Sequence, residues 1–173
     1  NQFGIKTEIG LCLEDVKKIN LGYTKRVTKK LPYIILKHAI SADNKIAYSD
    51  YKSKWISNNK SRDDVQYIRA SSCGILTTAR TVKYDNPRLN VRKTKKELGI
   101  KTNFKQPVQI ILDSSLSLNI KKYKIFMSRN KKIIFNSKIS KYNSQYNIDY
   151  IKVPLEDNRL KLKKIMEILA KDY

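Results

Sequence analysis

Few side chains in this chain of 173 residues are of the types that catalyse reactions unaided. His38 is the single histidine, and it falls in an apolar run, so a packing role is favoured over a catalytic one. The two cysteines, Cys12 and Cys73, form neither a zinc knuckle nor a disulfide framework in sequence. No GxGxxG, Walker, HExxH or CxxC motif is present. By elimination, the sequence predicts that any catalysis draws on an organic cofactor, with the protein supplying position and electrostatics.

Arginine is the scarce cation, with 8 arginines against 29 lysines. Its planar guanidinium is the better group for bidentate recognition of phosphate, and it is used sparingly here. On helical spacing alone, Arg69 is more simply explained as a solvated surface residue. The surrounding motifs reverse that preference.

The run from Pro32 to Arg92 contains a series of motifs in a fixed order. They read PYIILKHAISADNKIA, SKWIS and RDDVQYIRASSCGILTTARTVKYDNPRLNVR. This run resembles the reductase domain of the bifunctional riboflavin-biosynthesis deaminase/reductase, and residues 107–114 resemble the next strand of that domain. Residues 1–30 resemble the tail of the preceding deaminase domain. The zinc motifs of the deaminase are not found, so deaminase activity is not expected.

The resemblance implies a dihydrofolate-reductase-like α/β fold, with a mostly parallel sheet flanked by helices. It implies NADPH as the hydride donor and 5-amino-6-(5-phosphoribosylamino)uracil as the substrate, whose ribosyl chain is reduced to the ribityl form. The nucleotide-contacting positions of the family fall on Ala39, Trp55, Thr81, Asp85 and Ser114. Its substrate-contacting positions fall on Ser53, Arg69, Leu89 and Arg92. No catalytic residue is assigned and no metal is expected.

Several of these residues also have a plain structural explanation. Trp55, the single tryptophan, could pack in the core, and Asp85 could form the turn before Pro87. Leu89 would act mainly through its backbone. Without the family motifs, the hydroxyl groups of Ser53, Thr81 and Ser114 would be read as ordinary loop side chains.

The sequence departs from the family at two turns. The glycine before the lysine is Asn44, which can take the left-handed conformation, and the second acid of the Asp-Asp-Pro turn is Asn86. The Gly-Glu pair before Ser53 is Tyr51-Lys52, which reverses a charge beside the proposed site.

Strands and helices must alternate to position these residues. Apolar runs predict buried strands over residues 33–40, 73–77, 89–91, 108–112, 133–136 and 150–153. Ser57 or Asn58 is expected to cap a helix that runs to about Ser71, and a final amphipathic helix is expected after Asp157. Residues 1–30 predict a short strand, a helix and a basic connector. This alternation is typical of an α/β sheet with mostly parallel neighbours.

The predicted domains follow from the resemblance. Residues 1–30 are a remnant of the deaminase-domain tail with its connector, and residues 31–173 are the reductase domain. The family continues past the final helix into further strands and a glycine-rich segment for the NADPH phosphates. None of these is found here, so a reductase domain with its C-terminal strands missing is expected.

The formal net charge of +22 points first to nucleic acid as a partner. Because the charge comes mainly from scattered lysines in a composition typical of AT-rich coding sequence, specific nucleic-acid binding is not expected. The apolar runs are too short to span a membrane. Two distant cysteines and the lack of a signal peptide predict a reduced, cytoplasmic protein.

Two other functions remain open from the sequence. A basic RNA- or ribosome-binding domain would explain the charge, and would show steep salt dependence without selectivity between nucleotides. A non-catalytic remnant of the reductase, acting as a homodimer or in association with a deaminase domain, would explain an unpaired sheet edge.

Overall fold

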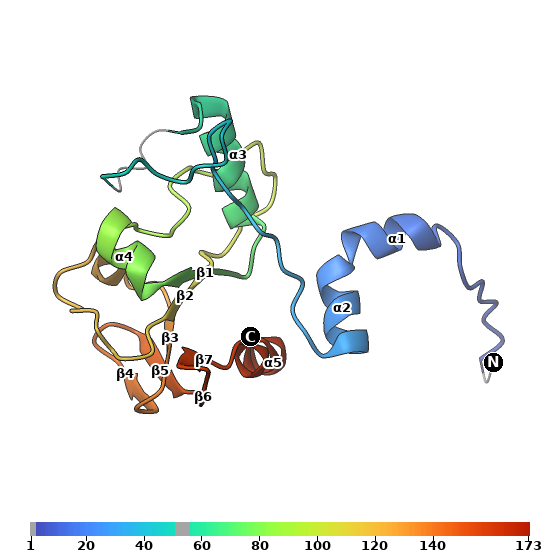
Figure 1. Cartoon of the computed structure of the whole chain (residues 1–173). Helices are drawn as coiled ribbons and strands as arrows, with labels where there is room; N and C mark the ends of the chain where they lie inside the picture. Colours follow the sequence, from blue (N-terminus) through green and yellow to red (C-terminus); the bar gives the residue numbers. More distant parts are fainter. Residues whose placement is uncertain (1–2, 51–55) are drawn as a thin grey trace. The chain divides into compact units, whose positions relative to one another are not determined.

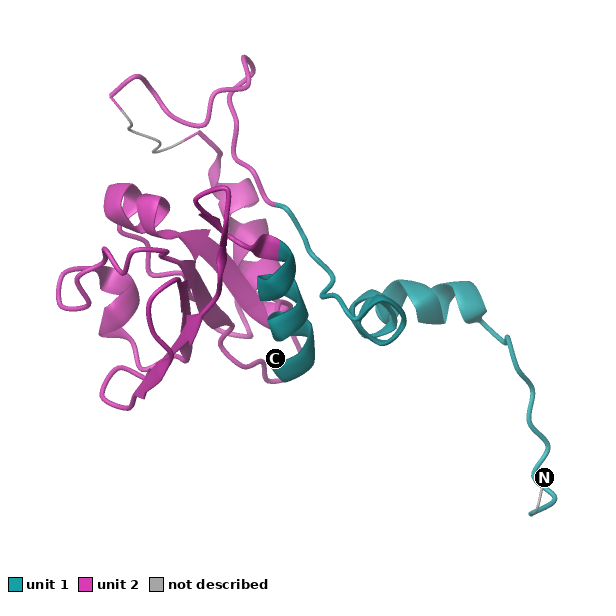
Figure 2. Cartoon of the chain, turned by 60° about the horizontal axis from the view of Figure 1, so that its bottom comes forward, with its two compact units in different colours: residues 1–36, 163–173 teal, residues 37–162 magenta. Residues whose placement is uncertain are grey.

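The computed structural model describes residues 3–50 and 56–173, which form two compact units (Figure 2). One unit contains residues 37–162 and carries the β-sheet. The other combines the N-terminal residues up to Leu36 with residues 163–173. Ser53 and Trp55, two of the predicted site residues, lie outside the described residues.

Five strands form the main sheet (Figure 1). In chain order they are β1 (Gly74–Thr78), β2 (Val108–Leu112), β3 (Lys132–Asn136), β4 (Lys141–Asn143) and β5 (Ile148–Lys152). Their spatial order is β1-β2-β3-β5-β4, and all neighbouring pairs are parallel except β4 with β5. A small hairpin of β6 (Leu155–Glu156) and β7 (Arg159–Leu160) follows. The expected α/β fold with a mostly parallel sheet is confirmed.

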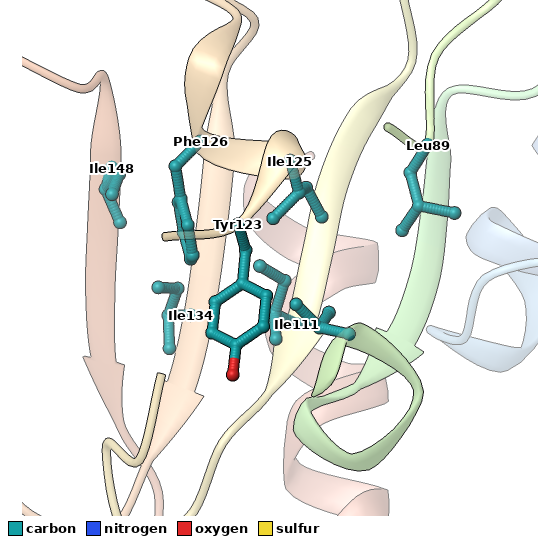
Figure 3. Close-up of a cluster of buried hydrophobic side chains, with 8 residues drawn as sticks. Leu89, Ile111, Tyr123, Ile125, Phe126, Ile134 and Ile148 are labelled. Atoms are coloured by element: carbon teal, nitrogen blue, oxygen red, sulfur yellow. The ribbon is translucent and has the colours of Figure 1, made fainter. Parts of the chain in front are cut away.

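The core of the sheet comes from strands that are apolar on both faces. All five residues of β3 are buried, and in β2 the central residues are buried. Ile111 and Ile134 are partners in the parallel register of β2 and β3. They belong to a cluster of eight buried side chains, seven of which are labelled in Figure 3. Continuous apolar runs are typical of parallel strands, because crossover connections cover both faces of such a sheet.

Three short helical elements belong to the sheet-bearing unit. They are α3 (Asn59–Ala70), α4 (Ala79–Asp85) and the 3-10 helix η1 (Lys124–Met127). Asn58 caps α3, since its side chain accepts a hydrogen bond from Ser61 N at 2.9 Å. Ile125 and Phe126 of η1 contribute to the core cluster. Of the two predicted caps, Ser57 and Asn58, the structure has Asn58.

The other unit is helical. It contains α1 (Leu13–Ile19), α2 (Leu21–Lys29) and nearly all of α5 (Leu162–Asp172). Neither α1 nor α2 has a buried residue. The expectation of a strand and a basic connector in residues 1–30 is wrong for residues 3–30, because Lys25 and Lys29 lie within α2. None of the helices in the described part of the chain combines the length and apolar character needed to cross a membrane.

The apolar run of residues 33–40 is extended but forms no strand, contrary to prediction. Ile35 is 56% exposed and Leu36 is 78% exposed, and His38 is exposed rather than packed in a core. A run of apolar side chains favours extended backbone, but a strand forms only where a neighbouring chain accepts its hydrogen bonds. Residues 33–40 make no such backbone pairing with any other described segment of the chain.

Strand β1 was expected to be buried, but it lies at an edge of the sheet. Its only partner among the described strands is β2, with Gly74 opposite Val108 and Thr78 opposite Leu112. Leu76 is 40% exposed as a result. An edge strand keeps one row of backbone groups without strand partners.

Lys132 at the start of β3 is fully buried without a carboxylate partner among the described residues. Its Nζ donates to the backbone carbonyls of Ser128 at 2.6 Å, Asn130 at 2.8 Å and Tyr146 at 3.3 Å. Burial lowers the pKa of Lys132 from 10.5 to about 8. The three carbonyls hold the ammonium group in place and partly compensate for its lost hydration.

We expect the protein to become more stable as the pH rises from about 8 to about 10.5, the folded and ordinary pKa values of Lys132. In this window the unfolded chain binds more protons at Lys132 than the folded chain, so the free energy of unfolding increases with pH. The total gain is at most about 3.5 kcal/mol, since one pKa unit corresponds to about 1.4 kcal/mol. Urea titrations across this range should show the rise in the wild type and its loss in Lys132→Met. Equal slopes in the two proteins would contradict the assignment.

Candidate functional site

Three side chains along one face of α3 hold the segment of residues 90–93. Gln66 Oε1 accepts a hydrogen bond from Arg92 N at 2.9 Å, and Arg69 Nη1 donates to Asn90 O at 3.1 Å. One turn earlier, Asp63 forms an ion pair with Lys93 at 2.6 Å. Residues three apart on a helix share a face, so a motif with this spacing can bind a segment that runs alongside it. Helix α3 therefore fixes both Arg69 and Arg92.

Two further glutamines hold the neighbouring part of this segment. Gln106 accepts from Val91 N at 2.9 Å and donates to Val91 O at 3.1 Å. Gln109 Nε2 donates to the carbonyls of Arg88 at 2.5 Å and Leu89 at 3.2 Å. The strand expected over residues 89–91 is absent. Backbone groups that would bond to a neighbouring strand are instead hydrogen-bonded to the side-chain amides of the two glutamines. Leu89 also has a positive φ of 46°, which is incompatible with a regular strand.

A cavity of about 420 Å³ opens beside α3 and this segment. It is lined by Asn59, Arg62, Asp63, Gln66, Arg92 and Lys93. Three of these side chains are cationic and one is a carboxylate, so the lining carries a net positive charge. The arrangement is suited to a small anion such as a phosphate group.

The positive charges of Arg69 and Arg92 influence each other. Burial lowers the pKa of Arg69, and the positive charge of Arg92 lowers it further. Among the described residues, neither guanidinium forms an ion pair with a carboxylate. Two neighbouring guanidinium groups without a counter-charge are stabilised by a bound anion.

The structure brings together three of the four predicted substrate-contacting residues. Arg69 belongs to α3 and Arg92 to the segment that α3 holds, while Leu89 lies just before that segment and is held by Gln109. Leu89 packs its side chain in the core cluster, so only its backbone could face a ligand. Arg92 is exposed and is one of the residues that line the cavity. Sequence reasoning missed Gln66, although the motif DVQ places it one turn before Arg69.

The predicted nucleotide-contacting residues are less closely grouped. Thr81 follows the carboxyl end of β1, where Thr78 Oγ1 accepts from Thr81 N at 3.3 Å. Ser114 follows the carboxyl end of β2, and its carbonyl accepts from Ser137 N at 3.0 Å. Because β1 and β2 are parallel, both residues lie at the same edge of the sheet, where open α/β sheets bind ligands. Asp85 is exposed at the end of α4.

Ala39 is half-buried in the extended segment before a tight turn. In that turn, Ser41 N donates to Lys45 O at 2.9 Å and Ser41 Oγ accepts from Lys45 N at 3.0 Å. Asn44 has a φ of 60°, as predicted for a residue in the place of a glycine. Within residues 3–50 and 56–173, no group of three or more His, Cys, Asp or Glu side chains could hold a metal ion.

The parallel sheet and the cationic cavity define an α/β domain with a dihydrofolate-reductase-like fold. The sequence model of one family, the RibD C-terminal domain, matches residues 32–172. The chain belongs to this family.

Curated relatives are riboflavin biosynthesis proteins named RibD. The protein from Haemophilus influenzae is 40% identical over 116 residues, which cover 64% of this chain and 31% of that protein. The protein from Escherichia coli is 37% identical over 118 residues, covering 65% of this chain and 32% of that protein. The matched region thus spans about a third of the length of these relatives.

Solved structures of related proteins also match this chain. A diaminohydroxyphosphoribosylaminopyrimidine deaminase/5-amino-6-(5-phosphoribosylamino)uracil reductase from Thermotoga maritima superposes with a TM-score of 0.77 at 30% identity, over 98% of this chain and 44% of that chain. RibD from Acinetobacter baumannii gives a TM-score of 0.82 at 27% identity, over 99% of this chain and 45% of that chain.

Proposed function

We propose that the chain carries the NADPH-dependent reductase of riboflavin biosynthesis, which converts the ribosyl chain of 5-amino-6-(5-phosphoribosylamino)uracil to the ribityl form. The observation that carries this proposal is the pair of neighbouring guanidinium groups, Arg69 and Arg92, beside a cationic cavity. A phosphorylated ligand supplies the negative charge that this pair lacks within the protein. Family membership gives the reaction class.

One group of residues binds the phosphorylated substrate and another binds NADPH. Arg69 and Arg92 bind the phosphate of the substrate, and the backbone at Leu89 lies against its sugar. The hydroxyl groups of Thr81 and Ser114 hold the nucleotide at the carboxyl edge of the sheet, and Asp85 is the third ligand there. These polar groups fit a nucleotide, because hydroxyl and backbone groups at this edge can bind ribose and phosphate oxygens. When bound, NADPH would supply the hydride for the reduction.

The domain organisation is part of the same proposal. Residues 31–173 form the reductase domain, and residues 1–30 connect it to a deaminase domain, which the name of the Thermotoga maritima structure includes. The helices α1 and α2 suit a connector that packs against another domain, since Ile19 is 80% exposed and Tyr23 is 71% exposed.

Calorimetric titration of the purified chain with NADPH, and with NADH as the control, tests the cofactor. We expect saturable binding that favours NADPH and changes little with salt. Consumption of NADPH in the presence of the phosphorylated substrate, but not of its dephosphorylated form, tests the reaction. Equal and strongly salt-sensitive responses to both nucleotides would instead indicate a general polyanion-binding surface.

A further inference from the structure

Gln66 is a buried polar side chain that contacts the backbone of Arg92, and both residues line the cavity. It is 5% exposed, and its Oε1 accepts from the backbone N–H of Arg92 at 2.9 Å. The same side chain lines the cavity beside Arg92. Buried polar groups are nearly always hydrogen-bonded. The hydrogen bond to Arg92 N therefore fixes the orientation of the Gln66 side chain.

The position of the Arg92 side chain depends on this hydrogen bond, whereas the neighbouring residues are held by other contacts. Its side chain is exposed, and no hydrogen bond or ion pair to its guanidinium is found in the described part of the chain. A long side chain without such contacts samples many rotamers, and only its backbone anchor limits where the guanidinium can reach. Gln66 provides that anchor, whereas Asp63 and Arg69 contact Lys93 and Asn90 instead.

We propose that Gln66 is a positioning residue that acts through Arg92. By fixing the Arg92 backbone, it keeps the guanidinium at the cavity where a phosphate monoester binds. The inference rests on the proposed function, since it takes Arg92 to be the phosphate ligand. It adds a residue of α3 that contributes to ligand binding by holding the backbone of Arg92.

A double-mutant cycle with ribose 5-phosphate as the probe tests this inference. We expect Gln66→Met, which keeps side-chain length but removes the acceptor, to raise the dissociation constant about tenfold. In the Arg92→Met background, the same substitution should change it less than twofold. Gln145→Met is the matched control, because Gln145 is exposed and outside the site. Tenfold effects in both backgrounds, or none in the wild type, would overturn the inference.

The proposed function and this inference fail in different ways. If Arg92→Met binds ribose 5-phosphate as tightly as the wild type, the phosphate site itself is wrong. If Arg92→Met weakens binding and Gln66→Met does not, only the role of Gln66 is wrong.

Amide hydrogen exchange of the wild-type protein adds a test that needs no variant. The Arg92 amide should be protected although its side chain is exposed, and ribose 5-phosphate should increase its protection. Rapid exchange of that amide, unchanged by the probe, would refute the anchor.

Discussion

Replacing Arg92 with methionine should weaken binding of the proposed phosphorylated substrate about 100-fold. The variant removes the guanidinium of a residue that lines the cationic cavity, and this guanidinium has no ion-pair partner among the described residues. A bidentate contact to phosphate comprises two charge-assisted hydrogen bonds, so a loss of about 3 kcal/mol is reasonable, and each 1.4 kcal/mol corresponds to a factor of ten. The remaining charge of Arg69 should retain weak binding.

The measurement is the KM for the phosphorylated substrate beside its kcat, together with the dissociation constant of ribose 5-phosphate. We expect the KM to rise and the kcat to change much less, because the phosphate is remote from the reacting carbon and is held equally in the ground and transition states. Arg159→Met is the matched control, since Arg159 is exposed on β7. A fall in kcat at unchanged KM would place Arg92 at the reacting centre instead.

Replacing Phe126 with alanine should lower the free energy of unfolding by about 4 kcal/mol. Phe126 is 3% exposed and packs in the core cluster with Ile134 and Ile148 (Figure 3). Removal of a buried aromatic ring loses its transfer free energy and leaves a cavity, which typically costs about 3–5 kcal/mol. This is a large part of the about 5–15 kcal/mol that stabilises an ordinary domain.

Urea unfolding followed by circular dichroism measures this loss. The transition midpoint should fall while the slope stays constant, since the variant changes stability rather than the surface exposed on unfolding. Phe3→Ala is the matched control, because Phe3 is 85% exposed and its substitution should change stability by less than about 0.5 kcal/mol. A similar loss in both variants would show that the core lies elsewhere.

The sequence predicted the inner strands well because their signal is local. Each of β2 and β3 contains three consecutive apolar residues, as expected for strands with both faces covered. Residues 33–40 carry the same signal but form no strand, because pairing depends on a distant segment that the run itself does not specify. The edge position of β1 was missed for the same reason.

Only those site residues that lie within the family motifs could be predicted from the sequence. The resemblance to the family, rather than helical spacing, singled out Arg69 and Arg92, and in the structure the charge of Arg92 lowers the pKa of Arg69. The supporting contacts of Gln106 and Gln109 could not be foreseen, since they join residues 15 to 21 positions apart through side-chain amides. Such contacts leave no periodic pattern in a sequence.

The three glutamines that hold residues 88–92 have a consequence for the electrostatic potential of the cavity. A carboxylate at position 66 could also accept from the Arg92 amide, but its negative charge would cancel much of the positive potential at the two guanidinium groups. Neutral amides hold the segment and leave that potential intact. A cleft lined by one sign of charge steers oppositely charged molecules toward it and speeds their association. The rigid segment can thus attract anions from about a Debye length away, roughly 8 Å at physiological salt.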